Sequence, residues 1–263
     1  MNQTQEFYRR IDDALHDDQL RRNFRTAMGG VMERRAQQFP DDAQLQALRE
    51  QAQMVRANSL VKQPELLERL EQKLTENGIQ VHWAETPEQA NAIIHGILAS
   101  ADAKSVVKGK SMVSEETELN HYLEERDIEV IESDLGEYII QLAQEPPSHI
   151  VMPAVHKNRF EVAELFRKFH PDIPYTEDVD ELTQTARQIL RSRFANADAG
   201  ISGVNFAVAE TGTLCLVENE GNGRLSTTAP RLHIAITGIE KVVERLSDVP
   251  PLLEILTKSA TGQ

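Results

Sequence analysis

Polar and ionisable side chains gather around two apolar runs in the segment Ala207 to Arg224. The runs flank a Glu210-Thr211-Gly212 turn, and apolar runs broken by glycine are typical of paired strands. The loop after the second run is the most polar part of the segment, and its side chains include Glu218, Glu220, Asn222 and Arg224. Polar side chains just past strand ends lie where binding sites on α/β sheets usually form. The segment therefore predicts a binding or catalytic site.

Glu210 is the best single candidate for acid or base chemistry. It lies at the turn between the two apolar runs, where partial burial would raise the pKa of its carboxyl group. The alternative is a carboxylate that accepts hydrogen bonds from the backbone amides of Gly212 or Thr213. The sequence leaves both roles open.

Arg224 offers a second kind of chemistry. A guanidinium in a loop with Asn222 can hold a carboxylate or phosphate through two parallel hydrogen bonds. A salt bridge to Glu218 or Glu220 would give the same sequence pattern. Both interpretations stand.

The segment Lys108 to Ser111 resembles the end of a phosphate-binding P-loop. That motif needs glycine five residues before Gly109, where this chain has Lys104, so a nucleoside triphosphatase is excluded. The ammonium groups of Lys108 and Lys110 nevertheless follow a predicted strand and precede a helix expected to start at Ser114, an arrangement that favours an anion. A structural turn is the alternative.

These observations lead to the hypothesis of one pocket for an anionic small molecule. Its predicted ligand-binding residues are Lys108, Lys110, Ser111, Thr211, Gly212, Asn222 and Arg224, with Glu210 as the catalytic candidate. No metal site is predicted, because the eight histidines form no HExxH motif. His149 and His156 are expected to be structural or surface residues. Cys215 is the only cysteine, and its apolar surroundings predict a buried strand residue.

Strand and helix patterns alternate from Pro64 onward and predict an α/β fold. Strands are expected at 79–83, 105–107, 128–131, 150–152, 201–209, 213–218 and 232–237. Helices are expected at 64–77, 86–100, 114–125, 159–169, 181–194, 239–246 and 252–258, and another after the cap Asp134. Such alternation predicts a mostly parallel sheet flanked by helices, with an antiparallel pair formed by 201–209 and 213–218.

Residues 1–60 form an N-terminal helical segment in this prediction, and residues 61–263 form the α/β domain. The N-terminal segment has few strand signals, and we expect two or three helices broken near Gly29-Gly30 and at Phe39-Pro40-Asp41. Its basic stretch, which includes Arg21, Arg22 and Arg25, would either dock on an acidic partner or form a solvated helix face.

Charge and hydropathy exclude two classes of partner. The formal net charge of −14 argues against nucleic acid, because phosphate binding needs a basic surface. No window approaches the run of about 18 apolar residues that a membrane span needs. The N-terminal stretch carries no targeting signal, so a cytoplasmic location is expected.

Several long motifs of this chain resemble the LUD domain of the lactate-utilization protein B family, the iron-sulfur subunit of the bacterial L-lactate-oxidizing complex. They are NF at 23–24, VKGKSMVSEETELN at 107–120, IESDLGEYIIQLAQEPPSHIVMPAVHKN at 131–158, GISGVNFAVAETGTL at 200–214, VENEGNGR at 217–224, PRLHIAITGIEKVV at 230–243 and SATGQ at 259–263. The resemblance implies a sheet of the sugar-isomerase and CoA-transferase-like class. The resemblance does not identify a catalytic residue in this domain.

Family members continue past the position of Gln263 into a ferredoxin-like half with cysteine clusters for two [4Fe-4S] centres. The resemblance therefore implies the LUD half of a longer protein, with no cofactor in this chain. In the family, three proteins together oxidize L-lactate to pyruvate, so we expect a subunit of an electron-transferring oxidoreductase complex, whose partners are the other subunits. We do not expect this half to be active alone.

Two alternatives from other classes remain. In the first alternative, the domain is itself an enzyme that acts on an anionic ligand such as a CoA-like, sugar-phosphate or folate-like molecule. The analogy with other proteins of this fold class permits that role. Otherwise it would be a scaffold that docks partners through residues 1–60.

Overall fold

The computed structural model describes residues 3–260 and 262, and its contacts divide the chain into two compact units. Unit 1 comprises Met1–Pro40, Gly136–Ala186 and Thr257–Gln263, and unit 2 comprises Asp41–Leu135 and Arg187–Leu256. Both units therefore contain segments from either side of the predicted domain boundary at residue 60. That boundary stays a prediction.

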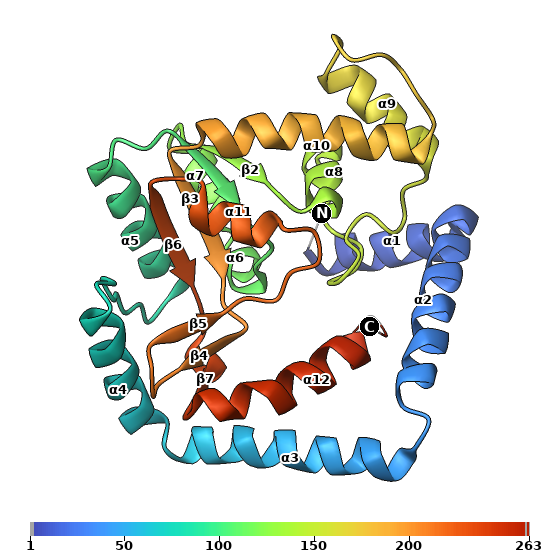
Figure 1. The fold of residues 1–263 in the computed structure, drawn as a ribbon. Helices are drawn as coiled ribbons and strands as arrows, with labels where there is room; N and C mark the ends of the chain where they lie inside the picture. The colour runs from blue at the N-terminus through green and yellow to red at the C-terminus, as the bar shows by residue number, and fades with distance from the viewer. Residues whose placement is uncertain (1–2, 261, 263) are drawn as a thin grey trace. The chain divides into compact units, whose positions relative to one another are not determined.

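A parallel sheet forms the centre of unit 2 (Figure 1). Among the described residues its strands run in the order β2 (Glu129–Glu132), β1 (Ser105–Lys108), β3 (Ala199–Gly203) and β6 (Leu232–Ile236). All neighbouring pairs in this sheet are parallel, and Val107 pairs with Ile131 on one side and Gly200 on the other. The predicted class, a mostly parallel sheet flanked by helices, is confirmed.

Helices of unit 2 bury the sheet. They include α5 (Pro87–Ser100), α6 (Met112–Glu116), α7 (Leu119–Glu124) and α11 (Asn222–Thr228). Leu98, Leu119 and Leu123 have no exposed surface and pack with Val106 and Ile201 of the sheet. α5 starts where predicted, because the Thr86 hydroxyl accepts a hydrogen bond from the backbone N–H of Gln89.

A second, smaller sheet continues from the first. β4 (Phe206–Val208) pairs antiparallel with β5 (Thr213–Cys215) and parallel with β7 (Val242–Val243), next to α3 (Asp42–Val61), α4 (Gln63–Glu76) and the first residues of α12 (Val249–Ala260). The predicted antiparallel pair is confirmed for β4 and β5. The expected single strand at 201–209 is two strands, because Asn205 bonds across to Cys215 and turns the chain out of the parallel sheet.

Unit 1 is helical in its described part. It contains α1 (Gln3–His16), α2 (Asp18–Gln38), most of α8 (Leu135–Ala143), α9 (Arg159–Phe169) and the first half of α10 (Val179–Asn196). The bounds of α9 agree with the prediction, and its first turn carries a capping box between Asn158 and Glu161. Tyr138 and Phe166 are buried in this unit, and the Tyr138 hydroxyl lies 2.7 Å from Nε2 of His170.

The predicted helix break at Gly29-Gly30 is wrong, and the break at 39–41 is confirmed. α2 runs through both glycines, since a glycine inside a helix costs only about 1 kcal/mol. Instead the chain breaks at Asp17, whose carboxylate accepts a hydrogen bond from the backbone N–H of Leu20 at 2.9 Å.

Two predicted strands and one predicted helix are also wrong. Residues 79–83 have no regular secondary structure and pair with no strand among the described residues. At 150–152 the backbone N–H groups of Val151 and Met152 donate to Nδ1 of His149, so they are not available to a sheet. The expected helix at 239–246 consists of the short helix η1 (Ile239–Lys241) and the strand β7, with η2 (Leu246–Asp248) just after, because pairing with β4 overrides the local pattern.

No helix within residues 3–260 is long and apolar enough to cross a membrane.

Candidate functional site

A buried ionic network lies at the carboxyl end of β1. The side chain of Lys108 has no exposed surface, and its Nζ lies 2.9 Å from Oε1 of Glu132 and 3.1 Å from Oε1 of Glu115. It also donates a hydrogen bond to Oγ of Ser114 at 3.0 Å. Burial disfavours the ammonium, but the two carboxylates outweigh burial and raise the pKa of Lys108. The network ties the ends of β1 and β2 to α6.

Glu132 is the acidic centre of this network. Its side chain is 4% exposed, and Oε1 also accepts a hydrogen bond from Nδ2 of Asn120 at 2.6 Å. Burial raises the pKa of Glu132, Lys108 and Asn120 oppose that shift, and the charge of Glu115 adds to it. Two carboxylates therefore share one ammonium. A ligand contact by Lys108 would require this network to open.

Serine hydroxyls connect the strand ends to α11. Oγ of Ser133 donates to the carbonyl of Lys108 at 2.8 Å and lies 3.3 Å from Oγ of Ser226. Ser226 in turn donates to the carbonyl of Asn222 at 2.9 Å. Because all of these serines and Asn222 are buried, the start of α11 is fixed to the ends of β1 and β2.

Lys110 and Ser111 continue from β1 along the same edge. Ser111 caps α6 through the backbone N–H of Ser114, so the helix starts at Met112 and not at the predicted cap Ser114. The end of β3 comes close to this cap, since a Cβ atom added to Gly203 would lie 3.1 Å from Oγ of Ser111. Lys110 and Ser111 therefore lie where the parallel strands end, as expected for a binding edge of an α/β sheet.

Glu220 places a carboxylate with a raised pKa at this edge. Its Oε2 accepts a hydrogen bond from the backbone N–H of Leu135 at 3.2 Å. Burial and the charge of Asp134 raise the pKa of Glu220, while the ammonium of Lys110 opposes them. A carboxyl group that holds its proton more strongly than usual, next to a lysine, is suited to proton transfer.

Arg224 pairs with an acid of its own loop. One guanidinium nitrogen lies 3.3 Å from Oε1 of Glu218, and the backbone N–H of Arg224 donates to Oε2 of the same carboxylate at 2.7 Å. The structure thus shows the salt bridge that sequence left as an alternative. The Arg224 side chain is 79% exposed, so the other face of its guanidinium meets solvent.

The predicted catalytic residue Glu210 lies in a different place. Its Oε2 accepts a hydrogen bond from the backbone N–H of Leu246 at 3.0 Å, and not from the amides of its own turn. The carbonyl of Thr211 accepts from Nδ2 of Asn77 at 3.0 Å, which holds the turn against the end of α4. Gly212 has a φ of +68°, and a Cβ atom there would lie 2.9 Å from the backbone of α4.

The structure divides the eight predicted residues into two groups. Val217 donates its backbone N–H to Oδ1 of Asn205, next to β3, so the loop 217–221 starts at the opposite end of the β4–β5 hairpin from the turn 210–212. One group at the edge of the parallel sheet contains Lys108, Lys110, Ser111, Asn222 and Arg224, and the other at the hairpin turn contains Glu210, Thr211 and Gly212. The described contacts do not bring these two groups together, so a single pocket stays a prediction.

Sequence reasoning did not select Ser133, Asp134 or Ser226, and it named Glu220 only as a polar loop residue and a possible partner of Arg224. Ser133 and Asp134 directly follow β2, a strand that the sequence does predict, at 128–131. Polar side chains just past the end of a strand are candidates for a binding site. Applying that criterion to this strand as well as to β1 would have found Ser133 and Asp134. The burial of Ser226 depends on the packing of α11 on β3 and carries no local signal.

A second group of polar side chains lies in unit 1. Oγ of Ser148 lies 2.7 Å from Nδ1 of His156, whose Nε2 lies 2.9 Å from Oε2 of Glu145. Glu145 also binds Nζ of Lys157 at 2.6 Å, and these two partners lower the pKa of Glu145 despite its partial burial. Ser148 donates to the carbonyl of Pro153 at 3.0 Å, so we interpret the group as the closure of a loop.

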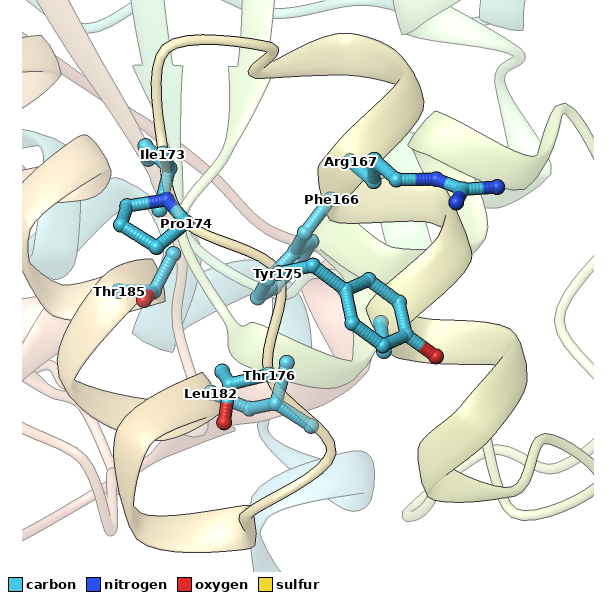
Figure 2. Close-up of a pocket in the computed structure, with 9 residues that line it drawn as sticks. Phe166, Arg167, Ile173, Pro174, Tyr175, Thr176, Leu182 and Thr185 are labelled. Atoms are coloured by element: carbon cyan, nitrogen blue, oxygen red, sulfur yellow. The ribbon is translucent and has the colours of Figure 1, made fainter.

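A small pocket in unit 1 is lined by Phe166, Pro174, Tyr175, Leu182 and their neighbours (Figure 2). Its volume is about 10 Å³, which leaves room for about one water molecule. This pocket is too small for a substrate.

Metal-ligating side chains do not gather in the described part of the chain, where no group of three or more His, Cys, Asp or Glu residues could hold a metal ion. A [4Fe-4S] cluster needs four thiolates, and the sequence has one cysteine, so the residues present do not fit that group. Cys215 lies in β5, as the apolar run predicts, but it is partly exposed and not fully buried; its partial burial raises the pKa of its thiol.

The fold and this edge define an α/β domain that gathers a lysine, an arginine, carboxylates and serine hydroxyls where its parallel strands end. The chain belongs to the LUD domain family, whose model matches residues 67–263.

Curated relatives match nearly the whole chain. It is 40% identical to lactate utilization protein B of Bacillus pumilus over 98% of this chain and 54% of that protein. It is 38% identical to lactate utilization protein B of Bacillus subtilis over 99% of this chain and 54% of the relative. It is 39% identical to the uncharacterized electron transport protein YkgF of Escherichia coli over 98% of this chain and 54% of that protein. The chain spans about half the length of these relatives, and no solved structure matches it significantly.

Proposed function

We propose that this chain is the LUD-domain part of the iron-sulfur subunit of an L-lactate utilization complex that oxidizes L-lactate to pyruvate. The observation that carries the proposal is the identity of about 40% to lactate utilization protein B over 98% of the chain. The other subunits of the complex are the partners in this proposal, and its location is the cytoplasm.

The edge of the parallel sheet is the part of this domain where we expect an anion to bind. The ammonium of Lys110 would pair with the carboxylate of the ligand, and the guanidinium of Arg224 would add positive charge at the same edge of the sheet. Glu220 would take up the hydroxyl proton, because its raised pKa matches a proton acceptor better than that of an ordinary glutamate. Glu210 lies at the other end of the hairpin, so we do not assign the proton transfer to it.

Lactate oxidation removes two protons and two electrons from each molecule. A carboxylate can accept a proton but not the electrons, so the proposal requires an electron acceptor supplied by the rest of the complex. The domain would then contribute substrate binding or assembly.

Exchange of this domain into a relative tests the proposed function. We expect a chimera of the B. subtilis lactate utilization protein B, with this chain in place of the matching half, to restore growth on L-lactate to a strain that lacks the native protein. A chimera with normal growth on glucose and normal abundance, but no growth on L-lactate, would contradict the proposal.

Calorimetry tests the anion site separately from growth. We expect L-lactate or pyruvate to bind the isolated chain, and Lys110→Ala to weaken binding at least about tenfold, as expected for loss of a charged hydrogen bond. Lys104→Ala is the matched control, since Lys104 precedes the same strand at its opposite end and is 76% exposed.

The same titrations distinguish the alternatives. Binding of a CoA-like, sugar-phosphate or folate-like molecule in place of lactate would favour a domain that acts alone on another anion. Absence of any binding, together with growth of the chimera, would favour a scaffold role.

A further inference from the structure

Helix α1 exposes a continuous apolar face. Phe7 is 60% exposed, Ile11 40% and Leu15 58%, and their spacing of four residues places them in one row on the helix. Tyr8, which is 65% exposed, borders that row and contacts the ring of Phe7 edge to face. Large apolar side chains gathered on one exposed helix face mark an interaction surface more often than scattered ones do.

The charges of α1 reverse their sign about Ile11. Two arginines, Arg9 and Arg10, come just before Ile11, and two aspartates, Asp12 and Asp13, come just after it. The apolar row is also symmetric about this residue, because Phe7 and Leu15 are each four positions away. A two-fold axis at Ile11 would therefore place the basic half of one helix beside the acidic half of another. A parallel pair would place like charges together.

We propose that α1 is a self-association surface, on which the α1 helix of a second copy of this chain packs antiparallel. The row of Phe7, Ile11 and Leu15 packs against the same row in reverse order, as an isologous interface requires. Rows spaced by four residues pack with crossing angles of about 50°, which limits the contact to two or three turns and fits a 14-residue helix.

The charge of α1 argues against a membrane as the occupant. Helices that lie on anionic lipid carry an excess of lysine and arginine on their polar face. α1 has two arginines against Glu6, Asp12 and Asp13, and Arg9 already pairs within the helix with Glu6 at 2.6 Å and with Asp13 at 2.8 Å. A surface that has no excess of cations, and on which the sign of the charge reverses along the helix, fits a second copy better than a lipid headgroup layer.

Sedimentation velocity of the complete chain at about 1 to 100 µM tests this surface, because short helix-pair interfaces bind weakly. We expect a reversible dimer, and we expect Ile11→Asp to raise its dissociation constant at least about tenfold. Met32→Asp is the control, since Met32 is 70% exposed on α2 and lies outside the row. Circular dichroism verifies that the variants retain their helices.

A charge exchange tests the antiparallel register. We expect Arg9→Glu with Arg10→Glu, and separately Asp12→Arg with Asp13→Arg, to be monomeric, because the first helix then carries only acids and the second carries four arginines with Glu6 as its one acid. An equal mixture of the two variants should form a heterodimer. A wild-type chain that stays monomeric, an Ile11→Asp variant that dimerizes normally, a mixture that stays monomeric, or flotation of the wild-type monomer with phosphatidylglycerol vesicles would overturn the proposal.

Discussion

Replacement of Lys108 by methionine is expected to lower the free energy of unfolding by about 3–5 kcal/mol. Methionine fills a similar volume, so the loss comes from charge and not from a cavity. Without the ammonium, the buried carboxylate of Glu132 keeps its hydrogen bond from Asn120 but loses the cation 2.9 Å away. Urea unfolding measures the difference. Lys104→Met, at the exposed start of the same strand, should stay within about 0.5 kcal/mol of the wild type.

The pH dependence separates this mechanism from general destabilisation. Burial already raises the pKa of Glu132, and removal of Lys108 would raise it further. A carboxyl group whose folded pKa lies above its unfolded value contributes stability at low pH and loses it as pH rises through the folded pKa. The deficit of Lys108→Met should therefore grow from about pH 5 to about pH 8. A deficit that is constant over this range, or one that adding Glu132→Gln does not reduce, would contradict the charge mechanism.

The lysines of the Lys108-Gly109-Lys110 segment show what the sequence can predict about the site. Their types and their place between a strand and a helix correctly indicate the carboxyl end of β1. The sequence could not show that Lys108 points into the domain, because its partner Glu132 comes from the neighbouring strand, 24 positions later. The pairing of β1 with β2 therefore determines that Lys108 is buried in an ion pair.

The difference between local and distant interactions also explains which helices and strands the sequence predicts correctly. Thr86 and Asn158 stabilise helix starts through residues within three positions, and α5 and α9 begin as predicted. The segments 79–83 and 239–246 have equally clear patterns, but the first lacks a neighbouring strand among the described residues and the second pairs with β4. A strand exists only where another strand accepts its backbone hydrogen bonds.

Separation of Glu210 from Lys110 follows from chain geometry in the same way. In sequence the hairpin turn and the loop 217–221 are close, and both are polar. The antiparallel pairing of β4 with β5 places them at opposite ends of the hairpin. Closeness in sequence therefore does not predict a shared pocket when a strand lies between the two segments.

Gly200→Ala is expected to destabilise the chain by about 3 kcal/mol, at the upper end of what overpacking costs. A Cβ atom at this position would lie 1.8 Å from the carbonyl oxygen of Ser226, and backbone atoms cannot yield as a flexible side chain can. α11 would have to move away from β3, and the contact of Ser226 with Ser133 would be lost. Thermal and urea unfolding measure the loss.

Gly96→Ala is the matched control for this substitution. Gly96 lies within α5 and has nothing within 4 Å of an added Cβ atom, so alanine there should stabilise the chain by about 0.5–1 kcal/mol through its higher helix propensity. Equal effects of the two substitutions would contradict the close approach of α11 to β3. If the destabilised Gly200→Ala chain still folds at low temperature, it should also bind lactate or pyruvate less tightly, because the displaced helix carries Asn222 and Arg224 at the edge of the proposed site.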